Sequence, residues 1–406
     1  MTAKGCSVVG GGVVWQTMRI ADLGTVVTGK TPSSNNPEHF GEDFPFITPT
    51  DMGLERIIQT ERFISHEGYL KFYRQILPPK SICFVCIGAT IGKICLTTQQ
   101  SLTNQQINSV VVDIERHDPF FIYYLFSTLG ETVKGIAGGA ATPIVNKTSF
   151  ENVEVKCPPL LMQRKIAAIL SAYDDLIENN LRRIKILEEM AQNLYREWFI
   201  KFRFPGHQHA RFIDSPLGRT PDGWEVVNLL DIVVVKYGKN LPTKNLNSDA
   251  AYPVYGAAKI IGKYAEYTRE ERTIITGCRG SVGEMQITLP KCFVTNNSFT
   301  FDVQQQIDFF WLFHCLKERG FADVIGGAAQ PQITLDGLSK VQIVVPLKAD
   351  RALFHEHAED IYSHLWNLES RNICLRRTRD LLLPKLITGE VDVTDLDITV
   401  PEEVAA

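Results

Sequence analysis

Residues 163–201 constrain the fold more than any other stretch, because they read as one unbroken helix. The stretch contains neither Pro nor Gly, and apolar residues recur at alternating steps of four and three from Ile166 through Ile177 and Leu187 to Trp198. Such a 3.5-residue repeat places a narrow apolar seam on one side of a helix, and the seam needs a partner helix. At 1.5 Å per residue this helix would be about 55 Å long, which exceeds what one globular core needs. The stretch therefore predicts a spacer helix.

A second seam with the same rhythm runs from Phe354 to Leu382. Each seam carries one Asn, and a buried Asn fixes the register of paired helices because it needs a polar group opposite. We expect an antiparallel pair in which Asn180 faces Asn372, Leu187 faces Leu365 and Leu194 faces Ala358. The predicted seam consists of Ile177, Asn180, Ile184, Leu187, Leu365, Leu368, Asn372 and Leu375. The alternative is two unrelated amphipathic helices, each packed on its own domain.

The segments that precede the two helices resemble each other. The sequence GGAATP at 138–143 recurs as GGAAQP at 326–331, and the strand-like NVEVKCP and KVQIVVP end at Pro158 and Pro346, so both pairs are 188 residues apart (326 − 138 and 346 − 158). Three further matches keep the same order: PFF at 119–121 with DFF at 308–310, GATIG at 88–92 with GSVG at 280–283, and TNQ at 103–105 with TNN at 295–297. This period indicates a duplicated domain-plus-helix unit rather than a solenoid.

The predicted fold class is α+β, with two similar mixed α/β domains joined by two long antiparallel coiled-coil helices in a pseudo-twofold internal repeat. The expected order is a leader (1–14), a first domain (15–159), a first spacer helix (160–204), a Pro- and Gly-rich linker (205–223), a second domain (224–346), a second spacer helix (347–390) and an acidic tail (391–406). We expect the tail to fray.

Composition narrows the class of protein. No run of 18 apolar residues occurs and the N-terminus lacks a signal-peptide core, so we expect a cytoplasmic protein without a membrane span. Cys83 and Cys86 form a lone C-x-x-C within an apolar run, without a second pair of ligands at zinc spacing. We interpret them as buried strand cysteines and predict no metal site.

Two similar domains on a helix pair suit duplex DNA, whose half-sites lie a set helical distance apart. Gly-rich turns allow backbone N–H groups to approach phosphates, Asn and Gln can read adenine, and Arg or Lys can read guanine. The candidate DNA contacts are Lys30, Thr31, Thr90, Lys93, Asn104, Gln105, Gln106, Lys239, Lys244, Lys259, Arg279, Ser281, Asn296 and Asn297. Alternatively, these residues serve turn geometry only. The net charge of −4 indicates that a partner supplies part of the grip on DNA.

These motifs resemble those of the specificity (S) subunits of type I restriction–modification systems, over nearly the whole chain. The matching stretches are GKTP at 29–32, the hairpin GATIGK at 88–93, NQQ at 104–106 and, most specifically, PPLLMQRKIAAIL at 158–170. The second half departs from the family pattern, with KADR at 348–351 and GKNLP at 238–242.

The resemblance implies a subunit without a catalytic site of its own, acting in defence against foreign DNA. Each target-recognition domain would read one half of a bipartite, asymmetric double-stranded DNA sequence, and the helix pair would set the unread gap. Methylation (M) subunits that bind S-adenosylmethionine would dock on the helices and methylate adenine. A motor–nuclease (R) subunit would cleave DNA with ATP and Mg. The chain itself would bind no cofactor.

Other classes of protein remain open at this stage. The stretch DPFF at 118–121 faintly resembles an amino-methyltransferase signature that has lost one Pro, which would suit a stand-alone DNA adenine methyltransferase. Glu154 and Lys156 have the E-x-K form of a nuclease, but strand alternation places both on an exposed face. A scaffold or inhibitor that does not read DNA, and the specificity subunit of a methylation-only system, are the remaining alternatives.

Overall fold

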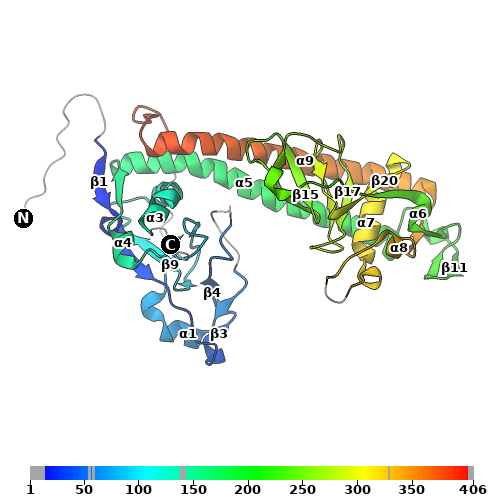
Figure 1. The fold of residues 1–406 in the computed structure, drawn as a ribbon, viewed down its shortest axis with the longest axis horizontal. Helices are drawn as coiled ribbons and strands as arrows, with labels where there is room; N and C mark the ends of the chain where they lie inside the picture. Colours follow the sequence, from blue (N-terminus) through cyan, green and yellow to red (C-terminus); the bar gives the residue numbers. More distant parts are fainter. Residues whose placement is uncertain (1–13, 54–55, 57–59, 138–142, 328–329, 401–406) are drawn as a thin grey trace, which may run out of the picture. The chain divides into compact units, whose positions relative to one another are not determined.

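The computed structural model describes residues 14–53, 56, 60–137, 143–327 and 330–400. Most of the predicted leader and parts of both Gly-rich repeats, at 138–142 and 328–329, lie outside these residues. The chain divides into two compact units: unit 1 comprises residues 1–180 and 370–406, and unit 2 comprises residues 181–369. Each unit contains one mixed α/β domain and a part of each long helix (Figure 1).

Unit 1 contains two four-stranded sheets and one strand pair. The first sheet has the order β2 (Gly24–Thr28), β9 (Ile107–Val112), β6 (Ile82–Val85) and β7 (Ile94–Leu96), and the second has the order β3 (Phe40–Gly41), β5 (Phe63–Ile64), β4 (Phe44–Ile47) and β8 (Leu102–Thr103). Strand β1 (Gln16–Arg19) pairs with β10 (Glu154–Cys157). The short helices are α1 (His66–Lys71), α2 (Pro119–Ser127), α3 (Gly130–Ile136) and α4 (Lys147–Glu151). Both Cys83 and Cys86 are buried, as predicted.

Unit 2 repeats this plan. Its four-stranded sheet has the order β14 (Val233–Tyr237), β20 (Ser298–Val303), β17 (Ile274–Gly277) and β18 (Met285–Ile287), and a second sheet has the order β16 (Lys259–Tyr264), β15 (Tyr252–Gly256) and β19 (Phe293–Val294). Strand β13 (Glu225–Asn228) pairs with β21 (Gln342–Val345), as β1 does with β10. The short helices are α6 (Leu229–Ile232), α7 (Phe309–Arg319) and α8 (Leu335–Leu338). The predicted linker contains an additional hairpin, β11 (Phe212–Ser215) with β12 (Gly218–Pro221).

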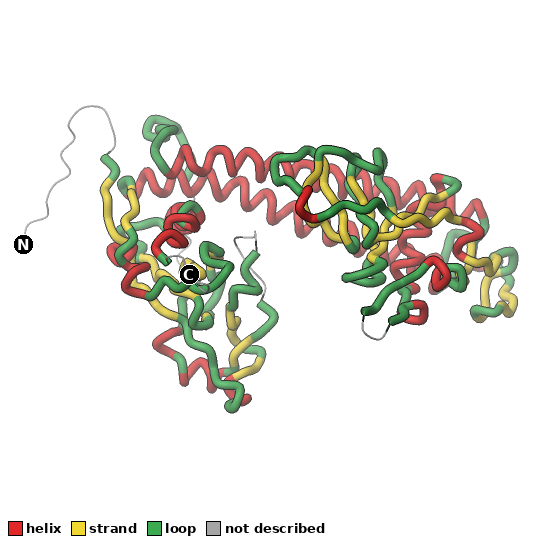
Figure 2. The backbone as a smooth tube through the Cα atoms, in the orientation of Figure 1, coloured by secondary structure: helices red, strands yellow, loops and turns green. Residues whose placement is uncertain are grey.

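The two long helices are α5 (Leu160–Tyr195), which a π-helical turn at Arg196–Ile200 extends, and α9 (Lys348–Ile387) (Figure 2). In unit 1 the buried side-chain amide of Asn180 donates to Asn372 Oδ1 at 2.8 Å. In unit 2 the rings of Trp198 and Phe354 lie 6.0 Å apart. As the residue number rises along one helix it falls along the other, so the pair is antiparallel, as predicted.

Four residues of the predicted seam pack in the same core, and the pairs Leu187–Leu365 and Leu194–Ala358 stay predictions. Leu187, Leu194, Ala358 and Leu365 belong to one hydrophobic cluster in unit 2. Burial of apolar side chains along a narrow stripe is what holds paired helices together, because each knob removes apolar surface from water. The fold class is therefore confirmed: two similar mixed α/β domains, with two long antiparallel helices.

The start of α5 is tied to its own domain by one buried amide. Gln163 Nε2 donates to Pro158 O at 2.9 Å, and Gln163 Oε1 accepts from Asp118 N at 3.0 Å. The side chain thereby connects the segments that lead into two helices, α5 and α2. This gives the Gln within the motif at 158–170 a structural role.

The expectation that the acidic tail frays is wrong for its described part. Val393 is buried in the core of unit 1, and Ile398 packs against that core. Lys165 Nζ donates to the carbonyl oxygens of Thr394 at 2.7 Å and Leu396 at 2.8 Å. A few apolar residues spaced among the acidic ones are enough to hold the segment, because each buried one removes apolar surface from water.

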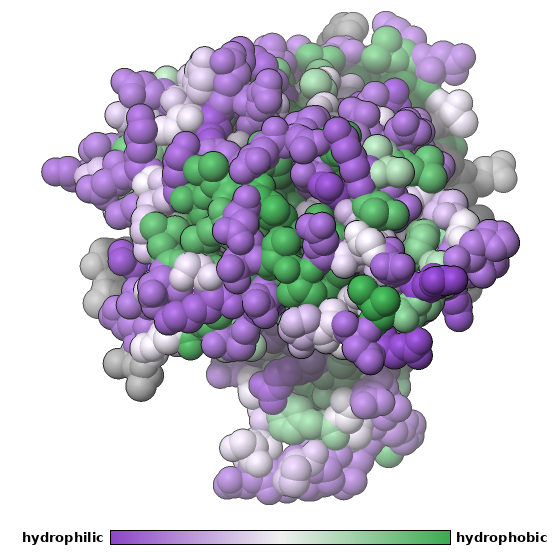
Figure 3. Space-filling view, turned by 90° about the vertical axis from the view of Figure 1, so that its right-hand side faces the viewer, coloured by the Kyte–Doolittle hydropathy of each residue, from purple (hydrophilic) through white to green (hydrophobic). Residues whose placement is uncertain are grey.

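None of the helices among the described residues has an apolar stretch long enough to cross a bilayer. Figure 3 shows an apolar area broken up by polar side chains on one face of the molecule. Scattered apolar side chains are ordinary on protein surfaces and do not by themselves mark a site.

Candidate DNA interface

In unit 1, three loops meet at one end of the first sheet. The antiparallel register pairs Thr28 at the end of β2 with Asn108, and Ile107 at the start of β9 with Val85 at the end of β6. Strand β7 starts at the same end, since Ile94 pairs with Phe84. The loops at 29–31, 86–93 and 104–106 therefore leave the sheet side by side, and together they contain all seven candidate residues of this domain.

Hydrogen bonds connect the first and third of these loops. Lys30 N donates to Thr103 O at 2.8 Å, and Thr31 Oγ1 donates to Gln105 Oε1. Gly29 allows this approach, because a Cβ there would lie 2.1 Å from Asn104 O. Lys30 and Gln105 are exposed, so both can reach a ligand beyond the sheet edge.

The NQQ turn is ordered by its own side chains. Asn104 Nδ2 donates to Gln106 Oε1 at 3.1 Å, and Gln106 N donates to Asn104 Oδ1 at 3.1 Å. Asn104 and Gln106 are half-buried, whereas Gln105 is exposed. Asn104 and Gln106 therefore serve turn geometry, whereas Gln105 is exposed and its Oε1 accepts from Thr31. Base reading by Gln105 stays a prediction.

The hairpin between β6 and β7 carries the other two candidates. Gly88 and Gly92 have φ values of +88° and +96°, a region that glycine adopts most readily. Lys93 Nζ donates to Pro49 O at 3.0 Å, and Lys93 N donates to Thr90 O at 3.2 Å. Thr90 and Lys93 are half-buried, so the lysine is held in place at this edge.

Unit 2 builds an equivalent edge from β14, β20, β17 and β18. Tyr237 at the end of β14 pairs with Phe299, and Gly277 at the end of β17 pairs with Ser298 at the start of β20. Strand β18 begins there too, because Met285 pairs with Thr276. The loops at 238–239, 278–284 and 295–297 thus gather at this edge, as their counterparts do in unit 1.

Five backbone hydrogen bonds recur at the two edges. In unit 1 they run from Gly29 N to Ile107 O (3.0 Å), Lys30 N to Thr103 O (2.8 Å), Cys86 N to Gln106 O (2.8 Å), Val85 N to Lys93 O (2.9 Å) and Gly92 N to Val85 O (3.1 Å). In unit 2 they run from Gly238 N to Ser298 O (3.1 Å), Lys239 N to Val294 O (2.9 Å), Cys278 N to Asn297 O (2.9 Å), Gly277 N to Glu284 O (3.2 Å) and Gly283 N to Gly277 O (2.9 Å). These bonds define which residues are equivalent.

This equivalence corrects the sequence match of TNQ at 103–105 with TNN at 295–297. The hydrogen bonds align Thr103 with Val294, so the match is out of step by one residue. The aligned pairs are Asn104 with Thr295, Gln105 with Asn296, and Gln106 with Asn297. The error arose because similar polar residues fill both turns, whereas the backbone ladder, and not residue type, determines the register.

The candidates of unit 2 do not all lie together. Lys239, Arg279, Ser281, Asn296 and Asn297 lie in the loops at the edge. Lys259 is brought there by Glu284, whose Oε2 lies 3.3 Å from Lys259 Nζ. Lys244 lies elsewhere, on the turn Thr243–Asn245, beside Asn247, which bonds to Lys263 O of β16 at 3.0 Å.

The sequence patterns of the rival enzyme classes have structural roles in the fold. Asp118 caps α2, accepting from Phe121 N at 2.8 Å, and Phe121 is buried in the core. Glu154 and Lys156 lie on the exposed face of β10, which pairs with β1. Asp118 thus stabilises a helix start, and neither motif lies at the edge where the loops gather.

Two arginines that sequence reasoning missed attach the domains to the long helices. In unit 1, Arg56 Nη2 lies 2.5 Å from Asp175 Oδ1 and 3.3 Å from Glu178 Oε1, both on α5. Burial lowers the pKa of Arg56, but the hydrogen bond with Asp175 and the charge of Glu178 outweigh it, so its pKa is raised. No periodicity marks an isolated arginine of this kind, so only the fold reveals it.

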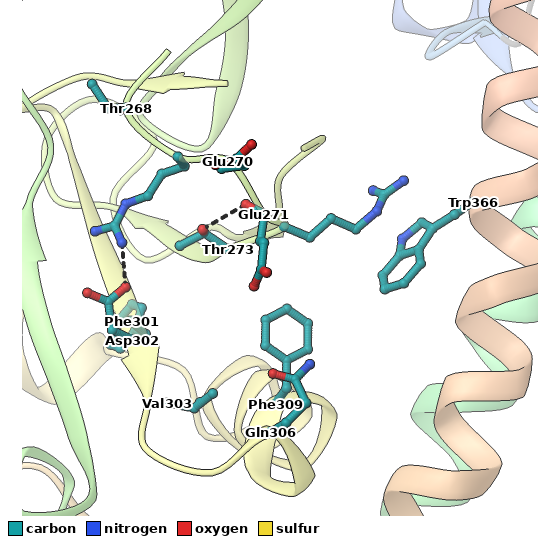
Figure 4. Close-up of a pocket in the computed structure, with 12 residues that line it drawn as sticks. Thr268, Glu270, Glu271, Thr273, Phe301, Asp302, Val303, Gln306, Phe309 and Trp366 are labelled. Atoms are coloured by element: carbon teal, nitrogen blue, oxygen red, sulfur yellow. Dashed lines mark hydrogen bonds and ion pairs between the residues drawn. The ribbon is translucent and has the colours of Figure 1, made fainter. Parts of the chain in front are cut away.

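In unit 2, Arg272 contacts α9. Its guanidinium lies 4.1 Å from the centre of the Trp366 ring and 3.7 Å from Glu369 Oε2. Burial raises the pKa of Glu369, an effect that the charge of Arg272 opposes. Trp366 and Arg269 line a cavity of about 500 Å3, and Arg269 Nη1 lies 2.6 Å from Asp302 Oδ1. Figure 4 shows Trp366 across this cavity from Asp302.

Comparisons with known proteins agree with this architecture. The model of the type I restriction modification DNA specificity domain family matches residues 13–189 and 221–369. The chain is 27% identical to the MjaIX specificity subunit of Methanocaldococcus jannaschii, over 94% of each chain. It is 34% identical to the HindI specificity subunit of Haemophilus influenzae over 181 residues, which are 43% of this chain and 39% of that protein.

Among solved structures, the type I restriction–modification S subunit from M. genitalium superposes with a TM-score of 0.57 at 17% sequence identity, covering 94% of this chain and 98% of that one. This likeness concerns the fold. The two segments that match the family model span most of the sequence, and they identify the chain as a member of the type I restriction modification DNA specificity domain family.

Proposed function

We propose that this chain is the non-catalytic DNA specificity subunit of a type I restriction–modification complex. The observation that carries the proposal is the pair of equivalent sheet edges, which share five backbone hydrogen bonds but differ in side chains. The shared backbone bonds present side chains to DNA with the same geometry in both domains. Because those side chains differ between the domains, they select different bases. Each domain therefore reads one half of a bipartite, asymmetric target in double-stranded DNA.

The long helices set the distance between the two half-sites and dock the methylation subunits. The Asn180–Asn372 bond supports the first role, because it fixes the register of the two helices along each other. The arginine contacts of Arg56 and Arg272 support it further, since each attaches one domain to a helix. A spacer of constant length is what a target with an unread gap of constant length requires.

Catalysis belongs to partner subunits in this proposal. Methylation subunits carry S-adenosylmethionine and methylate adenine, and a motor–nuclease subunit uses ATP and Mg to cleave DNA. The net charge of −4 supports shared binding, because a protein that neutralises many phosphates alone needs a basic surface. The chain acts on DNA inside the cell, so we place it in the cytoplasm.

Methylation mapping tests this function. The chain is co-expressed with a methylation subunit from the same system, and modified adenines are located throughout the host DNA. A split motif with an unspecified middle is expected. If the two proteins co-purify and yet modify nothing beyond what the methylation subunit modifies alone, the proposal is refuted.

A further inference from the structure

The two equivalent hairpins carry opposite charges at one position. Lys93 O accepts from Val85 N in unit 1, and Glu284 O accepts the equivalent bond from Gly277 N in unit 2. The residue before each is a glycine with positive φ, Gly92 at +96° and Gly283 at +81°. The backbone therefore places the lysine and the glutamate at the same point of each sheet edge.

Each of these side chains is held by the segment that follows an equivalent strand, the loop after β4 for Lys93 and the start of β16 for Glu284. Strand β4 pairs in parallel with β8, as β15 does with β19. After β4, the carbonyl of Pro49 accepts from Lys93 at 3.0 Å, and after β15, the ammonium of Lys259 lies 3.3 Å from the carboxylate of Glu284. The side chains of Lys259 and Glu284 are 63% and 48% exposed, so the pair can still reach a ligand.

The turn that delivers Lys259 is unusual. Ala257 and Ala258 have φ values of +50° and +66°, in the left-handed region that residues other than glycine seldom adopt. The Cβ of Ala257 lies 3.2 Å from the place that a Cβ on Gly280 would occupy, so the turn packs against the hairpin. Costly backbone conformations persist where the surrounding structure enforces them, often at binding sites. Here the result is that Lys259 and Glu284 meet.

A carboxylate at a DNA-reading edge must face a donor. Placed against phosphate it would be repelled, whereas the amino group N4 of cytosine is the partner that Glu and Asp accept from in the major groove. Lysine donates to O6 or N7 of guanine. Lys259 can thus donate to guanine O6 or N7 while Glu284 accepts from N4 of the paired cytosine, so the two side chains together match one G·C base pair.

We propose that Glu284, held by Lys259, is a specificity-determining residue that reads a G·C base pair in the half-site of unit 2. The inference rests on the proposed function above and identifies a chemical feature of the target. Lys93 stands at the equivalent position of unit 1, where it supplies a donor only. The position in unit 1 therefore has no acceptor for a cytosine amino group, whereas the position in unit 2 has one.

The test compares methylation motifs of variants co-expressed with the methylation subunit. With Glu284→Gln, preference for the G·C pair at one position of one half-site should fall on the order of ten-fold, and the other half-site should stay unchanged. Glu284→Asp keeps the acceptor and should keep the motif. Lys93→Gln should alter only the opposite half-site. Glu225→Gln, an exposed glutamate on β13, is the matched control and should change nothing.

The outcomes separate the two proposals. If the wild-type chain gives no split motif, the proposed function itself fails. If the wild type gives a split motif and Glu284→Gln co-purifies with an unaltered motif, the inference is overturned and Glu284 serves only to pair with Lys259. Should Glu284→Gln not co-purify, Lys259→Gln removes the other member of the pair and provides the same test.

Discussion

The side-chain amide of Asn180 donates to the amide oxygen of Asn372 across 2.8 Å, in the buried seam between α5 and α9. Asn372 in turn lies 3.5 Å from the carbonyl oxygen of Ile177. A shift of either helix by one heptad would separate the two amides and place Asn180 opposite Leu365 or Asn372 opposite Leu187, so that one amide would lose its polar partner. This pair therefore favours one register over its neighbours.

Replacing one member of the pair should cost more than replacing both. Asn372→Leu leaves Asn180 buried without its partner, and we expect the free energy of unfolding to fall by about 1–3 kcal/mol. The double substitution Asn180→Leu with Asn372→Leu should recover most of that loss. Urea unfolding of the two variants measures the difference, with the exposed Arg371→Ala as control. A double variant less stable than the single one would contradict the argument.

Arg379→Ala should destabilise unit 1. Asp174 is buried, and it accepts from the hydroxyl of Tyr124 at 2.5 Å and pairs with Arg379. Without the arginine, a buried carboxylate keeps only one partner, and we expect a loss of about 3 kcal/mol. Thermal unfolding measures it. Arg377→Ala, at an exposed position on the same helix, should stay close to wild type, and equal stability of the two variants would contradict this role for the pair.

Unit 2 should lose stability as the solution becomes acidic. His314 is buried, with Nδ1 3.0 Å from Gln192 Oε1 and Nε2 3.1 Å from the hydroxyl of Tyr362. Burial lowers the pKa of His314 to about 3. Below about pH 6.5, His314 therefore binds a proton in the unfolded chain but stays neutral in the folded chain.

The contribution of His314 is fully present above pH 6.5 and declines as the pH falls from there towards 3. Between pH 7 and pH 5 the loss is about 2 kcal/mol. Unfolding at a series of pH values measures it, and His314→Gln should flatten the profile in this range. An equally steep profile in that variant would assign the effect to other groups.

Arg279→Ala should relax one position of one half-site. Its backbone N donates to Asn297 O at 3.3 Å, and its side chain is exposed beside the candidate reading residues. If it reads a guanine, binding to the cognate duplex should weaken by about 1–3 kcal/mol, while binding to a duplex changed at that base pair stays constant. Titrations of the assembled complex at fixed salt test this, with the exposed Glu225→Ala as control. Equal weakening on every sequence would mark Arg279 as a phosphate contact.

The helix pair could be predicted because its signal is local and periodic. A 3.5-residue repeat with one Asn in each seam left a single antiparallel register that satisfies both amides, and Asn180 does face Asn372. The duplication could be predicted because Gly and Pro punctuate both halves in the same order. Positions such as Gly88 and Gly280, with φ values of +88° and +80°, need glycine for backbone reasons, so they stand out in a sequence.

Features that depend on distant contacts could not be predicted in this way. The polar turns at 104–106 and 295–297 can be aligned in two registers by residue type. Backbone hydrogen bonds such as those of Lys30 to Thr103 and of Lys239 to Val294 decide between the two. The sequence did not mark Glu284 as a candidate residue, because its proposed role depends on Lys259, which only the folded turn brings beside it. The tail looked too acidic to pack, yet Val393 is buried in the core.

Because of the five backbone hydrogen bonds that the two edges share, the fold of each edge does not depend on the side chains that select DNA bases. These bonds join main-chain atoms, so exchanging the side chain at Lys93, Arg279 or Glu284 leaves all of them in place. A lineage that carries such a frame can pass from one target to another by single substitutions that leave these five bonds intact. The DNA sequence that the protein recognises can therefore change, in evolution or by design, through the side chains at these edges while the backbone architecture stays constant.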